Sequence, residues 1–282
     1  MRTLIVTSLV VPLLLCAAQA HAQQPPRVTE HAELHRTPGN ASLEVDAPRP
    51  LQQAVLALNE EYGWNVGYED PQWQSGGPDL VDDTDPTWRA SHPNERGVTR
   101  LRGGGFKSQY PELPATAHST AEESKVLAKL VADYNASGNP GKFALVSSAE
   151  GHFDVIGIGA TGANGQAQAM NPVLDTHISI AAFKGDGVAA IGAILKAVSA
   201  GRGLTVVPMM MPTSALMQQQ VSIAGNDVTA RSLLEQVIAQ TGRRLFWTVL
   251  YDADAKLFAV NLRAVTRTQY DTFGNKTQLL VQ

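Results

Sequence analysis

The stretch SKVLAKLVADYN (124–135), followed by KFALVSSAEGHFDVIGI (142–158), has the same pattern as RSLLEQVIAQTG (231–242), followed by RLFWTVLYDADAKLFAVNL (244–262). In each stretch, apolar residues first recur at helical spacing and then alternate. This predicts an amphipathic helix followed by a β-hairpin. Because the pattern occurs twice in one chain, it predicts two copies of one folding unit. Chance similarity between two helix–hairpin units is the alternative.

Working outward, two more helical patterns precede these stretches, at residues 51–62 and 188–198, each flanked by short alternating segments. The order strand, helix, strand, strand, helix, hairpin is therefore expected over residues 42–158 and again over 176–263. The predicted fold class is α+β, with two repeated βαβ–βαββ modules, each with two helices packed against its own small sheets. Four glycines are expected to end the helices, namely Gly63, Gly138, Gly201 and Gly242. Thr120 with Glu123 fits a capping box, and Thr229 fits an N-cap.

The segments between the periodic regions set the expected domain boundaries. Polar and proline-containing residues predict a flexible leader at 23–40, a linker at 161–175 and a polar tail at 266–282. The two modules then cover 41–160 and 176–265. The first contains a long loop at 69–117, in which 98–101 is expected to supply the strand that 221–223 supplies in the second. Loops of this length are either functional or disordered.

The N-terminus predicts export. Residues 1–22 have a positive start, an apolar run and small residues before the expected cut after Ala22, as in a cleavable signal peptide. The run is short for a membrane span and contains Pro12. The only cysteine, Cys16, leaves with the signal, which excludes a disulfide and a thiol nucleophile in the mature chain. We therefore expect a periplasmic or secreted protein with no membrane span after cleavage.

Composition indicates a folded chain. Hydrophobic residues make up 44%, which is enough for a core, and the formal net charge is −4 without a long basic run. Nucleic-acid binding needs clustered lysine and arginine, so it is not expected.

The second module resembles the secretin and TonB short N-terminal (STN) domain. The resemblance rests on Ala190–Val198, Gly203–Val207, Val221–Leu234 and the hairpin after Gly242, and the first module repeats its opening phrase at Pro50–Tyr68. It implies two helices between two small sheets, and a periplasmic contact or signalling module rather than a catalyst. Only residues 266–282 follow the second module, which favours a separate adaptor over a receptor extension.

Motifs of catalysis and cofactor binding are weak. Gly157, Gly159 and Gly162 fit G-x-G-x-x-G, but proline and polar residues follow where a dinucleotide fold needs a helix, so we interpret them as linker. The pairs His152/Asp154 and Asp175/His177 lack an evident third metal ligand. The acids of the long loop favour a solvated segment over a calcium site. These acids are Asp79, Asp82, Asp83 and Asp85. The sequence contains no G-x-S-x-G, H-E-x-x-H or P-loop motif. No catalytic residue, metal ligand or cofactor is assigned.

Aromatic and methionine residues provide the remaining candidates. Trp73 and Trp88 in the long loop are the candidate binding residues, for stacking on a sugar or an aromatic ligand; their alternative role is to pin the loop onto the domain. Met209–Met211 favours a core edge over an adaptable contact surface.

Function is therefore expected to be binding. The sequence favours a non-catalytic adaptor that recognises an envelope protein or peptide, through exposed strand edges that can accept an added strand. Two alternatives use the long loop: an enzyme with His92, His118 or Asp83, or a small-ligand carrier for a sugar or lipid with Trp73 and Trp88 lining a cleft.

Overall fold

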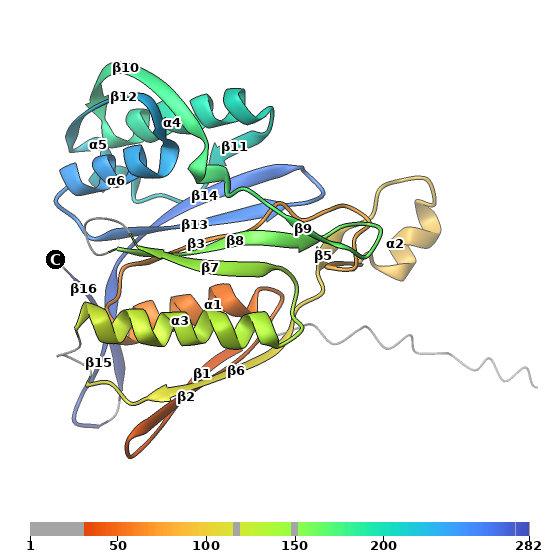
Figure 1. The fold of residues 1–282 in the computed structure, drawn as a ribbon, viewed down its shortest axis with the longest axis horizontal. Coiled ribbons are helices and arrows are strands. Elements are labelled where there is room, and N and C mark those ends of the chain that lie inside the picture. The colour runs from red at the N-terminus through yellow and green to blue at the C-terminus, as the bar shows by residue number, and fades with distance from the viewer. Residues whose placement is uncertain (1–30, 115–118, 148–151, 274, 282) are drawn as a thin grey trace, which may run out of the picture.

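The structure is a computed structural model and describes residues 31–114, 119–147, 152–273 and 275–281. The expected signal peptide, at residues 1–22, and His118 lie outside the described residues. The described chain has a mixed α+β fold, as the sequence predicts, with helices packed against several sheets (Figure 1).

The first half contains an outer sheet, two main helices and three strands of a central sheet. Its main elements are β1 (His31–Thr37), β2 (Asn40–Ala47), α1 (Pro50–Tyr62), β3 (Val66–Glu69), β6 (Gly104–Pro111), α3 (Thr120–Ala136), β7 (Lys142–Ser147) and β8 (Phe153–Thr161). Helix α1 starts with a proline and ends at Gly63, whose φ of 68° lies in the left-handed region. Helix α3 starts with a capping box made by Ser119 and Glu122, one residue before the expected pair.

From β2 onward, the second half repeats the order of main elements of the first. In the second half these are β10 (His177–Asp186), α4 (Gly187–Arg202), β11 (Thr205–Pro208), β12 (Gln220–Thr229), α6 (Ala230–Gln240), β13 (Leu245–Asp252) and β14 (Leu257–Ala264), with the short α5 (Thr213–Met217) between β11 and β12. Thr229 is the N-cap of α6, since its side chain accepts a hydrogen bond from the backbone N–H of Ser232. Helix α4 ends at Gly203, two residues beyond the expected Gly201.

The central sheet contains strands from both halves. Its order is β11-β14-β13-β3-β8-β7, so each half contributes three neighbouring strands. Within each trio the first strand runs parallel to the second, and the third runs antiparallel to it. The trios meet where β13 pairs in parallel with β3. The expectation that each module has only its own sheets is therefore wrong. Each of these two strands has an unpaired edge within its own half, and the pairing satisfies backbone groups where Thr248 and Val249 meet Tyr68 and Glu69.

The two halves place their helices on opposite faces of this sheet. Figure 1 shows α4 and α6 above the central strands and α1 and α3 below them. Beyond each helix pair lies a second, smaller sheet, β10-β12 on one side and β1-β2-β6 on the other. The large apolar core fills the spaces between these layers, and it includes Leu58, Leu127, Ile191 and Val237.

Three segments expected to lie outside the modules are part of the fold. Residues 31–37 of the expected leader form β1, which pairs along its whole length with β2. The expected linker contains β9 (Ala167–Ala169), paired with β8, and a 3-10 turn, η1 (Val173–Asp175), with two buried apolar side chains. The expected tail forms a hairpin, β15 (Thr266–Tyr270) with β16 (Lys276–Leu280), beside α1. In the linker, burial of Val173 and Leu174, which show no periodic pattern, explains the difference.

The long segment of the first half is also ordered by pairing. It contains β4 (Leu80–Asp82), α2 (Pro86–Ser91) and β5 (Thr99–Leu101), and β5 pairs with β4. The counterpart of β12 is therefore β6, and not residues 98–101 as expected. In β6 the buried Phe106, Ser108 and Tyr110 alternate with exposed residues, so the correct signal was present in the sequence.

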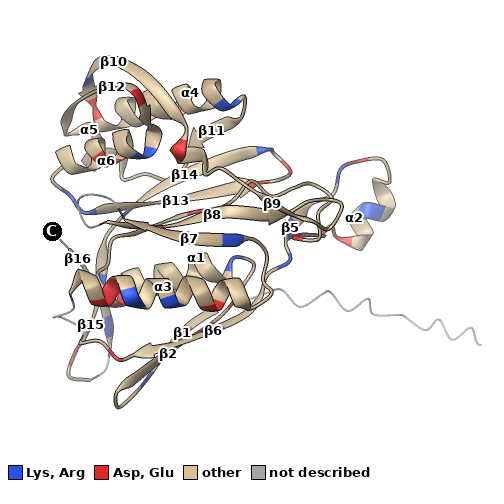
Figure 2. Ribbon diagram, viewed as in Figure 1, with Lys and Arg blue, Asp and Glu red and all other residues tan. Residues whose placement is uncertain are grey.

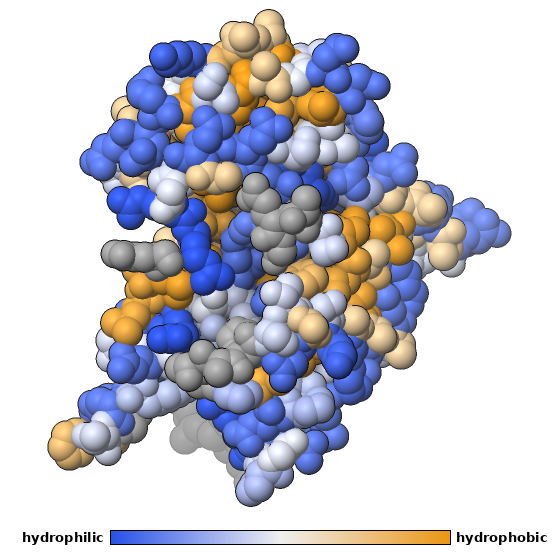
Figure 3. All heavy atoms as spheres, turned by 60° about the vertical axis from the view of Figure 1, so that its left-hand side comes forward, coloured by the Kyte–Doolittle hydropathy of each residue, from blue (hydrophilic) through white to orange (hydrophobic). Residues whose placement is uncertain are grey.

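Charged residues are spread over many elements rather than gathered on one face (Figure 2). Figure 3 shows a second view, in which hydrophilic residues cover much of the surface and apolar residues show between them in separate patches. None of the helices in the described ranges combines the length and apolar character needed to cross a membrane.

Candidate functional site

The two candidate tryptophans have different surroundings. Trp73 is 2% exposed and belongs to the core, where it packs beside Gly141; a Cβ at Gly141 would lie 2.7 Å from the Trp73 ring. Trp88 lies on α2 and stacks on His92 with ring centroids 4.6 Å apart. A ligand cannot stack on Trp73 while that side chain fills the core. The structure therefore favours its alternative role, pinning the loop onto the domain.

The acids of the long loop have separate structural roles. Asp79 is buried and accepts a hydrogen bond from the backbone N–H of Thr161 at 2.6 Å, so the expected solvated loop does not extend to this residue. Asp82 pairs with Arg89, and Asp83 with Arg100. Asp85 caps the N-terminus of α2. Among the described residues, histidine, cysteine, aspartate and glutamate form no group of three suited to a metal ion.

The H-x-D and D-x-H pairs contribute their aspartates to one ionic cluster, in which Asp154 is buried and Asp175 is partly exposed. Arg231, at the start of α6, contacts three carboxylates: Glu69 on β3 at 2.7 Å, Asp154 on β8 at 2.9 Å and Asp175 in η1 at 2.8 Å. Glu69 also accepts a hydrogen bond from the backbone N–H of Leu174. The second half thus supplies the cation, and the first half and the connecting segment supply the anions.

The histidines of these pairs point elsewhere. His152 hydrogen-bonds to the side chain of Asn65, and the His177 ring lies beside Asp227. In neither pair do the histidine and the aspartate therefore point toward a common ligand, although each pair contributes one carboxylate to Arg231.

Burial controls the protonation of this cluster. Removal from water raises the pKa of Glu69 to about 7, although Arg231 opposes the shift. The pKa of Asp154 rises to about 6 for the same reason, again against the effect of Arg231. Glu69 and Asp154 therefore retain protons at a pH where exposed acids are ionised.

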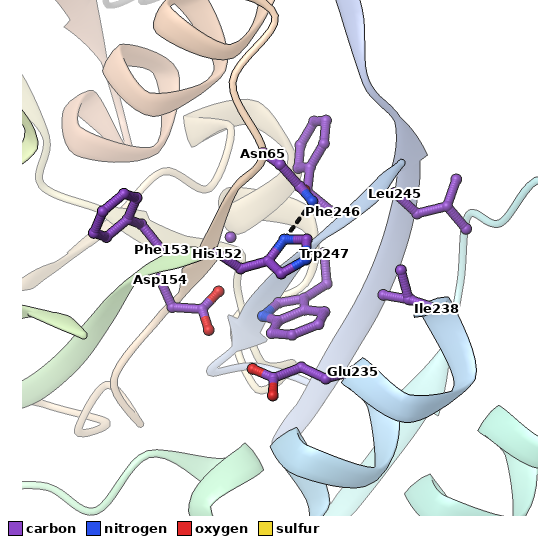
Figure 4. Close-up of a pocket in the computed structure, with 10 residues that line it drawn as sticks. Asn65, His152, Phe153, Asp154, Glu235, Ile238, Leu245, Phe246 and Trp247 are labelled. Atoms are coloured by element: carbon purple, nitrogen blue, oxygen red, sulfur yellow. Dashed lines mark hydrogen bonds between the residues drawn. The ribbon is translucent and has the colours of Figure 1, made fainter. Parts of the chain in front are cut away.

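A small pocket adjoins the cluster at the junction of the halves. Figure 4 shows the side chains of His152, Asp154 and Glu235 around the indole of Trp247. The Trp247 Nε1 group is buried and has no hydrogen-bond partner. A Cβ on Gly67 would lie 1.9 Å from Asp154 Oδ1 and 2.9 Å from Trp247 Nε1, so only glycine leaves these groups their space.

The size of this pocket limits what it can hold. It encloses about 10 Å³, which is roughly the space that one water molecule needs. It is therefore part of the junction between the halves rather than a substrate cavity.

Asp70 forms a second set of hydrogen bonds across the junction of the halves. It is completely buried, and its carboxylate accepts hydrogen bonds from Arg49 at 2.8 Å, from the Tyr68 hydroxyl at 2.8 Å and from the backbone N–H of Tyr251 at 3.0 Å. Arg49 also donates to the backbone carbonyl of Tyr251. Because Tyr251 belongs to β13 of the second half, these bonds hold the halves in one register.

Sequence reasoning missed Arg231, although the sequence contains a signal for it. Arg231, Leu234 and Ile238 lie at i, i+3 and i+7, on the apolar stripe of the helix. A charged residue on such a stripe is buried when the helix packs, and a buried charge needs a partner. The identity of its partners depends on how the halves join, which no local pattern contains.

The outer sheets differ at one edge. In the first half, β2 pairs with β6 on one side and with β1 on the other. In the second half, β10 and β12 are the counterparts of β2 and β6, and they form a two-stranded sheet. Within the described ranges, no strand occupies the edge of β10 that corresponds to the β1-covered edge of β2. This ten-residue strand therefore presents unpaired backbone groups.

Two sequence motifs have structural explanations. Gly157 lies on β8, where a Cβ would be 2.2 Å from the backbone nitrogen of Pro71. Gly159 and Gly162 belong to β8 and its turn into β9, so the G-x-G-x-x-G stretch forms a hairpin rather than the expected linker or a strand-to-helix turn.

The three consecutive methionines differ in exposure. Met209 and Met210 are 66% and 61% exposed, against the expected core edge, whereas Met211 packs against the core.

No family model matches this sequence, and it matches neither a curated protein nor a solved structure.

Proposed function

We propose that this protein is an exported, non-catalytic binding or adaptor protein that recognises a protein or peptide by strand addition to β10. The secretory signal predicted at residues 1–22 supports a periplasmic or secreted location. The resemblance to tandem STN-like modules supports a contact role, and the common order of elements in the two halves supports their origin as copies of one unit.

The observation that carries the proposal is the difference between β2 and β10. In the first half the chain fills the corresponding edge itself, with β1 antiparallel to β2 from His31↔Asp46 to Thr37↔Asn40. This pairing shows that an outer sheet of this geometry accepts a third strand at this edge. In the second half a partner strand would take the place that β1 takes in the first.

The irregular register of β10 favours pairing with one selected partner strand. Its register with β12 shifts between Ile178 and Ile180 and again between Ile180 and Phe183. Such bulges twist a strand and reduce indiscriminate edge-to-edge association. The partner must therefore match an irregular edge, which favours one partner over aggregation.

A proline at the edge tests the proposal. Ala182 is exposed and lies between the paired residues Ile180 and Phe183, where a proline removes a backbone donor without breaking a regular stretch of the β10–β12 ladder. We expect envelope extract to yield a partner with the wild type and not with Ala182→Pro. Lys196→Ala, on the exposed face of α4, is the control and should retain the partner.

Site-specific photo-crosslinking makes the test sharper. A photoreactive residue at position 182 should crosslink to the partner, and one at position 196 should not. Recovery of the partner by Ala182→Pro at the wild-type level, or crosslinking from both positions alike, would exclude strand addition at β10.

A further inference from the structure

A polar groove lies between α1, the C-terminal hairpin and β1. Its volume is about 780 Å³, within the usual range for small-molecule and peptide sites. Helix α1 and residues 32–35 of β1 line it on one side, and Tyr270 and Lys276 of the hairpin line it on another. The hairpin β15–β16 runs beside α1 at the lower left of Figure 1.

The groove follows from the way the halves join. The helices of the second half cover one face of β13 and β14, where Val249, Val260 and Leu262 are buried. Arg263 and Leu250 project from the opposite face, toward α1 of the first half. Since α1 and the hairpin cover this face only in part, the groove remains between them.

Glu33, Glu60 and Glu61 line the groove as well, and among the described residues Arg263 is the cation lining it that forms no ion pair. Arg49, which also lines the groove, pairs with Asp70 at 2.8 Å, and Lys276 lies 3.9 Å from Glu60. In the described part of the chain, no carboxylate lies within 4.0 Å of the Arg263 guanidinium, and its Nε group is buried without a hydrogen-bond partner. Arg263 as a whole is only partly buried and lines the groove, so its guanidinium is the cation that an anionic ligand would meet there.

We propose that this groove binds a ligand that presents a carboxylate, and that the Arg263 guanidinium holds it. The planar guanidinium and the planar carboxylate match in two parallel hydrogen bonds, which fixes the orientation of the ligand. Gln52, which is largely buried, and Tyr270, whose hydroxyl donates to Glu61, also line the groove. The site is separate from β10, so it does not depend on the proposed strand addition.

The carboxylate belongs either to a peptide or to a small organic acid. The backbone of β1 along the groove suits an extended peptide, and the volume also admits a small acid. The test therefore has two arms. One uses heptapeptides of mixed sequence with a free C-terminal carboxylate, compared with the same peptides amidated. The other uses succinate and glutarate.

Binding is measured by titration calorimetry and by the ¹⁵N-resolved Nε–H resonance of Arg263. We expect at least one arm to bind the wild type and to shift this resonance. Arg263→Gln should weaken binding by about 10- to 100-fold, the usual contribution of a charge-assisted hydrogen bond. Arg263→Lys should bind with intermediate affinity, because lysine keeps the positive charge but lacks the planar pair of N–H donors that matches a carboxylate. Far-UV circular dichroism checks that both variants fold.

Arg243→Gln is the matched control, since Arg243 is an exposed arginine outside the groove. It should bind like the wild type. Binding of the free peptides alone identifies a peptide ligand, and binding of the diacids alone identifies a small acid. Failure of both arms at millimolar concentration, or equal binding by the wild type and Arg263→Gln, would overturn the proposal. Capture of the β10 partner should be unchanged in Arg263→Gln.

Discussion

Arg231 contacts carboxylates from three separate parts of the chain, on β3, β8 and η1. A buried cluster of this kind is weak evidence for stability, because removing charges from water costs about as much as their attraction returns. It does specify geometry, since Glu69, Asp154 and Asp175 reach one guanidinium only when the halves join as observed. Its role is therefore to define how the halves join.

The cluster makes stability depend on pH. The pKa of Glu69 is raised to about 7 in the folded protein and that of Asp154 to about 6, so the fold retains protons that the unfolded chain releases. This contribution to stability is complete below the ordinary carboxyl pKa and is lost as pH rises through 6 to 7. We expect the free energy of unfolding to fall by roughly 4 kcal/mol between pH 5 and pH 8. Urea unfolding at each pH measures it.

Glu69→Gln tests the origin of this pH dependence. The amide resembles the protonated acid, so the variant should show a clearly smaller decrease over the same range. Glu95→Gln, at an exposed position, should keep the wild-type slope. A wild-type slope in Glu69→Gln would assign the pH dependence to other groups.

At the scale of elements, β1 and the C-terminal hairpin show how short segments complete a layer. Both consist of mostly exposed, polar residues and gave little periodic signal in the sequence. Their strands form because neighbouring elements offer an edge or an apolar patch. The buried Leu56, Phe246 and Val265 form such a patch, and Val281, just after β16, packs against it.

Removal of the hairpin should destabilise the fold. Truncation after Val265 would expose part of the cluster of Leu56, Phe246 and Val265, which we expect to cost about 3 kcal/mol, the effect of exposing one or two large apolar side chains. Chemical unfolding measures the change. Phe273→Ser, at an 89% exposed position in the hairpin, should have almost no effect and is the control. Unchanged stability after truncation would mean that the hairpin does not cover this cluster.

At the scale of the whole molecule, the halves are joined by more than the short pairing of β13 with β3. Arg231 and Asp70 make buried bonds across the junction. Arg96 and Thr99 of the long segment also bond to the turn between β13 and β14, at Asp254. Breaking the junction would expose these groups together, so neither half is expected to unfold alone.

We therefore expect one cooperative unfolding transition. Trp73 lies in the first half and Trp247 in the second, both buried. With fluorinated tryptophan incorporated, the ¹⁹F signals of both residues should lose their folded intensity at the same urea concentration. Midpoints that differ by about 0.5 M or more would show that the halves unfold independently.

The sequence by itself determined the four main helices, α1, α3, α4 and α6, the hairpins that follow α3 and α6, and their order. Amphipathic periodicity and caps such as Thr229 are local, and they predict an element wherever it packs. The tertiary structure alone decided that β13 joins β3, that Arg231 meets its carboxylates, and that Arg263 faces a groove. These are contacts between residues far apart in the chain, and their energy depends on burial and distance, which no local pattern records.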